Sequence, residues 1–219
     1  MPIISFPPIE NSDLHGLLAI GGDLSIPSLK LAYSKGIFPW PIENNLPLTW
    51  FCPDPRGIIA YEDLHISKSM KKIIKSNIFE IKFNHDFESV ISACATSSNR
   101  KEGEGTWITE DMRQAYIELF HCGLAYSAET YLEGALVGGV YGVCINGIIS
   151  GESMFYKYPN ASKFALIKLM KLLYNKGINW IDTQMISPVV ADLGGKEISR
   201  NIFIEKLAQV DKDIEPFDY

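Results

Sequence analysis

Two short turns between three apolar segments constrain the fold of this chain more than any other feature. The segments 125–132, 135–144 and 148–155 are joined by Glu133-Gly134 and Asn146-Gly147. A two-residue hairpin turn needs positive φ at both central residues, and glycine and asparagine adopt that conformation most easily. The sequence therefore predicts a three-stranded antiparallel meander.

Apolar periodicity and capping residues predict the elements around this meander. Helical spacing behind a capping residue predicts helices at 25–36, 67–76, 86–94, 109–123, 160–176 and 199–210. Alternating or continuous apolar runs predict strands at 48–51, 57–61, 79–83 and 178–182. This order of helices and strands predicts an α+β fold with a mixed sheet.

The character of the chain changes between about residues 60 and 100. The earlier part is rich in proline and glycine and has short elements, whereas the later part has longer regular ones. A chain of 219 residues is long enough for one large domain or two small ones. We therefore expect a small N-terminal domain at 1–62 and a larger domain at 63–219.

Composition argues against several classes of protein. A net charge of −6 is unfavourable for a protein that binds nucleic acid non-specifically, although a local basic patch remains compatible with it. The candidate patch, which fits a solvated helix face equally well, is Lys68, Lys71, Lys72 and Lys75. Four scattered cysteines and four scattered histidines suggest neither a disulfide framework nor a metal site. We expect a reduced cytoplasmic monomer that has no membrane segment, metal or cofactor.

Three polar residues stand at positions where apolar side chains are expected. Glu152 interrupts an apolar strand, so it needs a partner, a function or an exposed position on the alternate face. Asp182 and Gln184 end another apolar strand, and side-chain alternation places both on the same side of it. An aspartate there can hold or deprotonate an amine, and a glutamine amide can orient a carbonyl. The alternative is that Asp182 caps the turn at Pro188, which would explain a single aspartate but not the pair with Gln184.

Two tryptophans could stack on a nucleobase. Trp50 lies in a strand that precedes Cys-Pro-Asp-Pro-Arg56, and Trp107 lies just before the helix that begins after Thr109. Exposed aromatic rings bind bases by stacking, at about 1–3 kcal/mol per base. By spacing alone, both tryptophans fit an ordinary core position.

Seven motifs, in order, resemble those of leucyl/phenylalanyl-tRNA–protein transferases. Near the start they are Gly-Leu-Leu-Ala-Ile-Gly-Gly-Asp-Leu at 16–24 and Ala32-Tyr33 with Gly-Ile-Phe-Pro-Trp at 36–40. Next come Cys-Pro-Asp-Pro-Arg at 52–56 and Thr-Trp-Ile-Thr at 106–109. The last three are Gly-Glu-Ser-Met-Phe at 151–155, Asn-Ala-Ser-Lys at 160–163 and Asp-Thr-Gln at 182–184. Together they cover nearly the whole chain.

This resemblance implies a fold, a pair of substrates and roles for individual residues. The larger domain would have the acetyltransferase-like (GNAT-type) fold. The substrates would be the 3′ end of an aminoacyl-tRNA and an acceptor protein with an N-terminal arginine or lysine, which the transfer marks for N-end-rule degradation. Asp182 and Gln184 would be the catalytic or substrate-orienting pair, Glu152 would position an amino group, and Trp50 and Trp107 would contact the terminal adenosine.

An apolar slot for the transferred amino acid is expected between one helix and the neighbouring strands. Helical spacing places three leucines on one face, and methionine suits a slot that accepts both leucine and a phenyl ring. The six predicted lining residues are Val140, Met154, Leu166, Leu169, Leu173 and Ile181. Ordinary core packing would explain most of these residues as well.

Two alternative functions would explain part of these residues. An acyl-CoA-dependent N-acyltransferase of the GNAT type would need a glycine-rich turn for the pyrophosphate, whereas this chain has Asn160-Ala-Ser-Lys163 at that helix start. A non-catalytic module that binds a tRNA end or a peptide end would have no need of Asp182 and Gln184. The sequence leaves open the preference among leucine, phenylalanine and methionine.

Overall fold

A computed structural model gives the fold of the chain and describes residues 1–42, 46–96 and 107–217. The helices are α1 (Ile26–Tyr33), α2 (Lys68–Ser76), α3 (Phe87–Thr96), α4 (Glu110–His121), α5 (Ala161–Asn175), α6 (Pro188–Asp192) and α7 (Arg200–Ala208). Two 3-10 turns, η1 (Ile9–Asn11) and η2 (Tyr61–Asp63), complete the helical elements of the described residues.

Seven strands form one large sheet with both parallel and antiparallel neighbours. They are β4 (Arg56–Ala60), β5 (Glu80–Phe83), β6 (Ala125–Leu132), β7 (Ala135–Ile145), β8 (Ile148–Tyr156), β9 (Trp180–Gln184) and β10 (Lys196–Ile198). Their order across the sheet is β10-β4-β9-β8-β7-β6-β5. All neighbours are antiparallel except β8 and β9, which are parallel. The predicted α+β class with a mixed sheet is confirmed.

A second, three-stranded sheet lies near the N-terminus. Its strands are β1 (Leu17–Ile20), β2 (Phe38–Pro39) and β3 (Thr49–Phe51), in the order β1-β3-β2. Although β3 and β4 follow each other along the chain, β4 belongs to the large sheet. The sheet therefore changes between Phe51 and Arg56, and the domain boundary after residue 62 stays a prediction.

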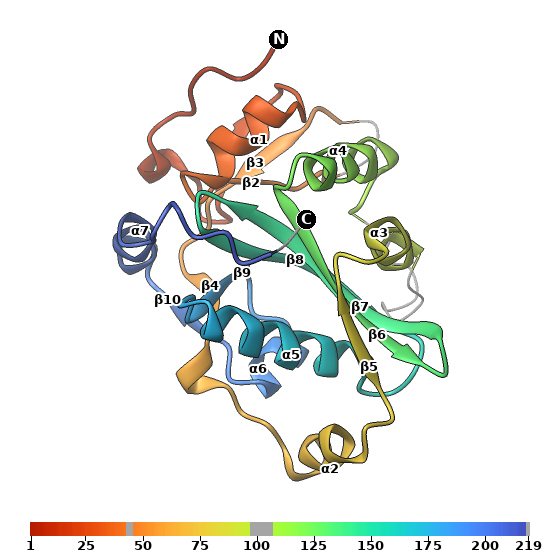
Figure 1. Cartoon of the computed structure of the whole chain (residues 1–219). Helices are drawn as coiled ribbons and strands as arrows, with labels where there is room; N and C mark the ends of the chain where they lie inside the picture. Colours follow the sequence, from red (N-terminus) through yellow and green to blue (C-terminus); the bar gives the residue numbers. More distant parts are fainter. Residues whose placement is uncertain (43–45, 97–106, 218–219) are drawn as a thin grey trace.

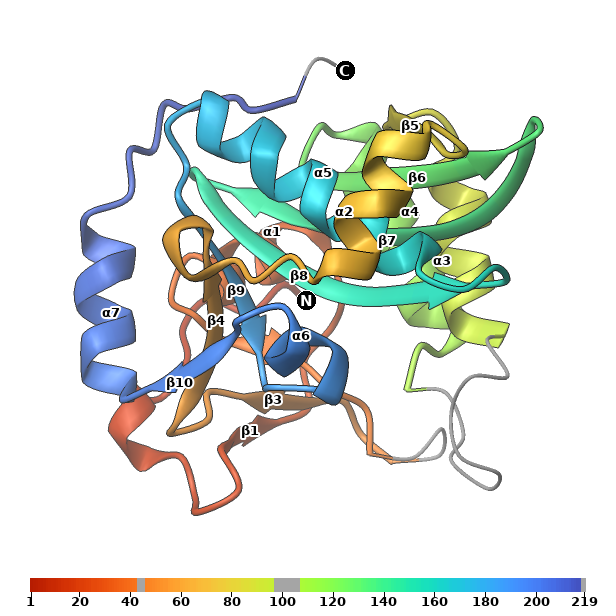
Figure 2. The same cartoon turned by 90° about the horizontal axis from the view of Figure 1, so that it is seen from below.

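Helices cover both faces of the large sheet (Figures 1 and 2). On one face, residues of α1, α3, α4 and β7 form a buried cluster that continues into the small sheet. On the other face, residues of α2 and α5 pack against the same strands in a second cluster. The central strands are thus covered on both faces. A polar side chain on either face of these strands therefore lies against other protein atoms.

The predicted turns and caps explain why these elements begin and end where they do. Glu133, Gly134, Asn146 and Gly147 all have positive φ, between 51° and 79°, so the meander β6-β7-β8 is confirmed. The Thr109 hydroxyl accepts a hydrogen bond from the Met112 amide at the start of α4. The strand predicted at 178–182 lies two residues later in the structure, where β9 runs from Trp180 to Gln184.

Candidate active site

A cavity opens where the two parallel strands separate. The only residues that pair β8 with β9 are Ser150 and Asp182, and beyond that point the strands diverge. The space between them has a volume of about 490 Å³. Its walls include Gly151 to Met154 of β8, Thr183 and Gln184 of β9, and residues 185–187 of the following loop.

An irregularity in β8 aims Glu152 at this cavity. Tyr141 pairs with Ser153 but Gly142 pairs with Gly151, so Glu152 is an extra residue between two paired positions. Such a bulge redirects the side chain that it carries. The opposite residue must be glycine-sized, because a Cβ on Gly142 would lie 2.0 Å from the Ser150 carbonyl oxygen.

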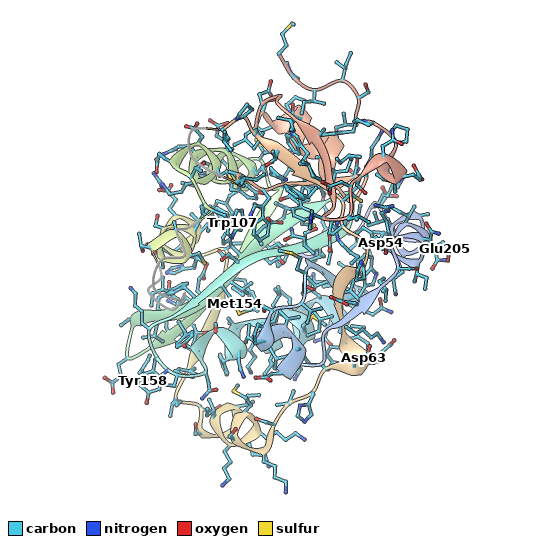
Figure 3. All side chains as sticks on the ribbon, turned by 180° about the vertical axis from the view of Figure 1, so that it is seen from behind. Asp54, Asp63, Trp107, Met154, Tyr158 and Glu205 are labelled. Carbon is cyan, nitrogen blue, oxygen red and sulfur yellow. The ribbon has the colours of Figure 1, made fainter. Side chains whose placement is uncertain are left out.

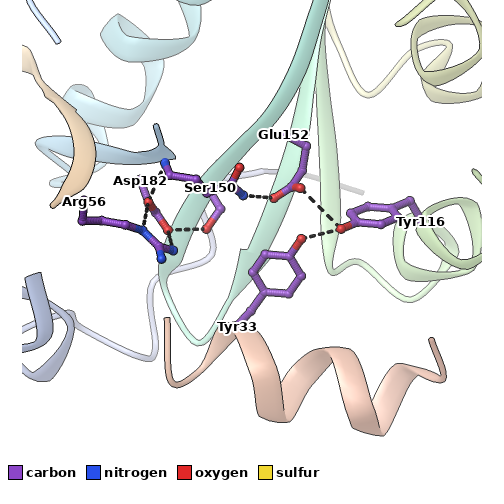
Figure 4. A network of polar contacts seen from close by, with 7 residues as sticks. Tyr33, Arg56, Tyr116, Ser150, Glu152 and Asp182 are labelled. Atoms are coloured by element: carbon purple, nitrogen blue, oxygen red, sulfur yellow. Dashed lines mark hydrogen bonds and ion pairs between the residues drawn. The ribbon is translucent and has the colours of Figure 1, made fainter. Parts of the chain in front are cut away.

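Glu152 is a buried carboxyl group held by three elements (Figure 4). Its Oε1 accepts a hydrogen bond of 2.8 Å from the Gln184 amide, and its Oε2 accepts one of 3.3 Å from the Tyr116 hydroxyl. The Tyr116 hydroxyl also bonds that of Tyr33, which comes from α1. Burial, together with the charge of Asp182, raises the pKa of Glu152 to about 7 despite these hydrogen bonds.

Asp182 has different surroundings, although it lies on the neighbouring strand. Arg56 binds both of its carboxylate oxygens, Nε to Oδ1 at 2.8 Å and Nη2 to Oδ2 at 2.6 Å, and both side chains are buried. The backbone N–H of Gln184 donates to Oδ1 at 2.9 Å, and the Ser150 hydroxyl donates to Oδ2 at 3.4 Å. Burial alone would lower the pKa of Arg56, but the Asp182 carboxylate outweighs it and the pKa lies above its usual value. Asp182 is not among the residues that line the cavity.

Gln184 connects the two carboxylates. Its backbone N–H binds Asp182 while its side-chain amide binds Glu152. Its φ is +62°, a conformation that is uncommon for a residue other than glycine. Such backbone conformations persist where the surroundings over-determine them, and they cluster at functional sites. The three predicted catalytic residues therefore form one connected group.

Four of the six residues predicted for the apolar slot line the cavity. They are Val140, Met154, Leu166 and Ile181. Leu169 and Leu173 do not line it, and both pack in the core between α5 and the sheet. Helical spacing placed all three leucines on one face correctly, but the cavity reaches only the first.

The two predicted tryptophans lie in different environments. Trp107 lines the cavity and stacks on Trp40, with ring centroids 5.3 Å apart and an interplanar angle of 20°. Trp50 is fully buried, and its indole N–H donates to the Gly21 carbonyl at 2.9 Å. Trp50 therefore has no exposed surface, whereas Trp40 lines the cavity together with Trp107. Figure 3 labels Trp107 and Met154, which line the same cavity.

Sequence reasoning missed four residues of this site. Trp40 and Arg56 both lie inside motifs of the family resemblance, Gly-Ile-Phe-Pro-Trp and Cys-Pro-Asp-Pro-Arg, but the resemblance implied a role for neither. Tyr33 lies in the motif Ala32-Tyr33 of the same resemblance, again without a role, whereas Tyr116 carried no signal, since a tyrosine on an apolar helix face fits a core position. Thr106, which begins the motif around Trp107, lies outside the described residues.

The described residues contain no group of three or more His, Cys, Asp or Glu side chains that could hold a metal ion. Within the same residues, every helix is too short or too polar to cross a bilayer.

The chain matches two family models. The model of the leucyl/phenylalanyl-tRNA protein transferase covers residues 58–208, and that of the N-terminal domain of the same family covers residues 22–54. A solved structure, a GCN5-related N-acetyltransferase-like protein from Streptococcus suis, covers 76% of this chain at 12% identity, and this chain covers 61% of it. Its TM-score of 0.38 is too low to support an argument about the fold.

Relatives with substantial identity agree with the family models. A leucyl/phenylalanyl-tRNA–protein transferase from Colwellia psychrerythraea is 48% identical over 210 residues, which is 93% of this chain and 86% of that protein. The protein of the same name from Yersinia pestis is 44% identical over 208 residues, which is 95% of this chain and 86% of that protein. The chain therefore belongs to the leucyl/phenylalanyl-tRNA–protein transferase family.

Proposed function

We propose that this protein transfers leucine or phenylalanine, and also methionine, from an aminoacyl-tRNA to an acceptor protein whose first residue is arginine or lysine. The product is an acceptor marked for N-end-rule degradation. The observation that carries the proposal is the cavity itself, which combines an apolar slot, a buried carboxyl group and two stacked tryptophans. The protein acts in the cytoplasm as a monomer, without metal or cofactor.

Each part of the cavity fits one part of the aminoacyl-tRNA end. Val140, Met154, Leu166 and Ile181 accept the apolar side chain of the transferred amino acid. They disfavour a polar side chain, which would lose its hydration without gaining a partner. Trp40 and Trp107 stack with the terminal adenosine. The fold of the larger part is of the acetyltransferase type, as the family resemblance implies.

Glu152 is the proton acceptor in this proposal. The acceptor amine attacks the ester carbonyl, a C–N bond forms, and the bond from the carbonyl carbon to the ribose oxygen breaks. The amine proton passes to Glu152 and from its carboxyl group to the departing ribose oxygen, which leaves as a hydroxyl. A carboxyl group whose pKa is about 7 suits proton transfer at neutral pH. When ionised, it also attracts a cationic N-terminal residue.

Asp182 and Gln184 position Glu152 instead of exchanging protons themselves. Both oxygens of Asp182 are bound by Arg56, so this carboxylate has little capacity left for an incoming amine. It holds the Gln184 backbone, and the Gln184 amide in turn orients the Glu152 carboxylate. Positioning of this kind supplies much of the rate of ester aminolysis.

The test uses labelled leucyl-tRNA and two peptides that differ only in an N-terminal arginine or alanine. The expected result is transfer of label to the arginine peptide alone, with loss of transfer but retained binding of phenylalanyl-adenosine in Glu152→Gln. No transfer from leucyl-, phenylalanyl- or methionyl-tRNA would contradict the proposal. In that case, binding of acetyl-CoA would favour the acyl-CoA-dependent alternative, and binding of the tRNA end alone would favour a non-catalytic module.

A further inference from the structure

Part of the cavity wall is left free by the aminoacyl-tRNA end. In the proposed function that end occupies the walls formed by the two tryptophans and the four slot residues. The side chains that remain come mainly from the loop after β9 and from α6, and they are Met185, Ile186, Ser187, Val189 and Val190. Among the apolar side chains that line the cavity, only Met185 is largely exposed, at 48%. Its side chain is therefore accessible to a second ligand.

The backbone of Met185 is held in place, although its side chain is exposed. Its N–H donates to the Thr183 carbonyl at 2.6 Å. It lies so close to β4 that a Cβ on Gly57 would be 2.7 Å from its carbonyl carbon. Two residues later, the Ser187 hydroxyl accepts a hydrogen bond from the Val190 N–H and caps α6. The loop is thus anchored on both sides of the exposed methionine.

Met185 lies one residue beyond the group that binds Glu152. The Gln184 side-chain amide donates to Glu152 at 2.8 Å, and the amine of the acceptor must reach the same carboxyl group. Consecutive Cα atoms are about 3.8 Å apart, so the step from Gln184 to Met185 equals the step from the first to the second acceptor residue. The positive φ of Gln184 interrupts the alternation of β9, and both residues line the same cavity. The second acceptor residue can therefore reach Met185 while the amine is at Glu152.

We propose that Met185 determines specificity by contacting the second residue of the acceptor, and that it favours an apolar residue there. The inference rests on the proposed function and deepens it, because it extends recognition beyond the first acceptor residue. A single exposed apolar side chain is ordinary on a protein surface, but this one is fixed beside the reacting group. Its neighbours in the wall, Ile186 and Val189, are apolar as well. A polar second residue would lose hydration there without gaining a partner, whereas methionine adapts to apolar groups of different shapes.

Two arginine peptides that differ only in a leucine or a serine at the second position test this contact. Transfer from leucyl-tRNA is measured for both, with kcat and KM determined separately. The variants are Met185→Ser, which removes the apolar surface, and Met185→Leu, which keeps it. Ile202→Ser is the matched control, because Ile202 is also 48% exposed but lies on α7 and does not line the cavity.

The wild type is expected to prefer the leucine peptide about fivefold in kcat/KM, close to the effect of removing one methylene group from water. The preference should appear in KM, because the contact is distant from the bond that forms. Met185→Ser should bring the ratio of the two peptides near one, whereas Met185→Leu and Ile202→Ser should keep it. The Kd for phenylalanyl-adenosine should stay near the wild-type value in Met185→Ser. A merely structural role would reduce transfer to both peptides equally and leave their ratio unchanged.

Equal kcat/KM for the two peptides in the wild type would overturn the inference, as would a preference that persists in Met185→Ser. An equal loss of preference in Ile202→Ser would also overturn it, since the effect would then not be local to the cavity. A raised Kd for phenylalanyl-adenosine in Met185→Ser, with the peptide preference intact, would assign this wall to the tRNA end instead. Absence of transfer to either peptide would contradict the proposed function itself.

Discussion

At the scale of single residues, the two carboxyl groups of the site differ in the groups that bind them. Glu152 and Asp182 lie on adjacent strands and are both buried, but only Asp182 has a guanidinium group bound to its two oxygens. The hydroxyl and amide groups that bind Glu152 are neutral, so burial raises the pKa of Glu152 to about 7. Asp182 thus has a cationic partner, whereas Glu152 has only neutral ones, and two carboxyl groups on adjacent strands differ in their environment.

The rate of transfer is expected to rise with pH through about 7, because Glu152 must be ionised to accept a proton. A pH–rate profile of kcat/KM measures this limb. Glu152→Gln should abolish the limb along with most of the activity. Asp182→Asn should keep the limb in its residual activity. A limb that disappears only in Asp182→Asn would assign the proton acceptor to Asp182.

Stability should depend on pH through the same group. Because the pKa of Glu152 rises from 4.5 to about 7 on folding, the folded protein retains a proton that the unfolded chain has already released. The contribution of Glu152 to stability is therefore largest below pH 4.5 and is lost as the pH rises through 7. Thermal unfolding at pH 5 and pH 8 should show Glu152→Gln gaining stability relative to wild type at pH 8, by up to about 3 kcal/mol. An equal difference at both pH values would exclude this linkage.

Removing one partner of the buried Arg56–Asp182 pair should be costly. Arg56→Met leaves an unpaired buried carboxylate and is expected to lower the free energy of unfolding by about 3–5 kcal/mol. The double variant with Asp182→Asn should recover part of that loss, which denaturant unfolding of all four proteins measures. The exposed pair Lys163–Asp192, with an Nζ–Oδ2 distance of 2.9 Å, is the control, and Lys163→Met should cost less than about 1 kcal/mol. Additive losses would mean that the two buried side chains do not stabilise each other.

At the scale of elements, the position of Glu152 depends on the bulge between β7 and β8. The Tyr126 hydroxyl donates to the Ser150 carbonyl at 3.2 Å, and Gly142 leaves room for both groups. A Cβ at residue 142 would contact that carbonyl at 2.0 Å and the Tyr126 hydroxyl at 2.6 Å. The backbone of a central strand cannot move aside at low cost, so the bulge and the carboxyl group that follows it are linked.

Gly142→Ala is expected to lower the free energy of unfolding by about 1–3 kcal/mol and to reduce kcat through displacement of Glu152. Gly151→Ala is the matched control on the opposite strand, because its nearest neighbour, the Ile181 side chain, would lie 3.6 Å away. Chemical denaturation and transfer assays compare the two variants. Equal stability of Gly142→Ala and Gly151→Ala would contradict the steric argument.

At the scale of the whole molecule, the cavity combines segments that are distant in sequence. Trp40 immediately follows β2 of the small sheet, whereas Trp107 precedes α4 beside the large sheet, and their rings stack at the cavity. Tyr33 of α1 likewise reaches the hydrogen bonds around Glu152 through Tyr116 of α4. The N-terminal part of the chain thus contributes side chains to the same site as the large sheet.

Replacement of Trp40 should weaken binding of the tRNA end without unfolding the protein. Trp40→Ala is expected to raise the Kd for phenylalanyl-adenosine about tenfold or more, since one stacking surface is lost. Trp50→Phe is the control, because Trp50 is buried and bonds Gly21. It should lower the unfolding temperature and leave Kd unchanged. A larger effect of Trp50→Phe on Kd would return the adenosine contact to Trp50.

Local patterns in the sequence were sufficient to predict most of the elements. The hairpin turn at Asn146-Gly147 and the cap at Thr109 involve only a few neighbouring residues. Such local signals determine where strands and helices begin and end, independently of residues distant in sequence. The unexpected polar residues Glu152, Asp182 and Gln184 were visible for a related reason, because each one interrupts an apolar pattern. These three residues prove to be in contact with one another or linked through Gln184.

Tertiary structure alone decided the surroundings of those residues. Trp40 directly follows β2 and Trp50 lies in the neighbouring strand β3. Only tertiary packing leaves Trp40 at the cavity and buries Trp50. Arg56 meets Asp182 across 126 positions of sequence, and this contact gives Asp182 a cationic partner that Glu152 lacks. Turns and caps are local in the chain, whereas burial and ion pairing depend on which distant segments meet. The sequence by itself therefore determined most of the elements and the polar residues of this protein, and the tertiary structure determined which of them are buried and which partners they have.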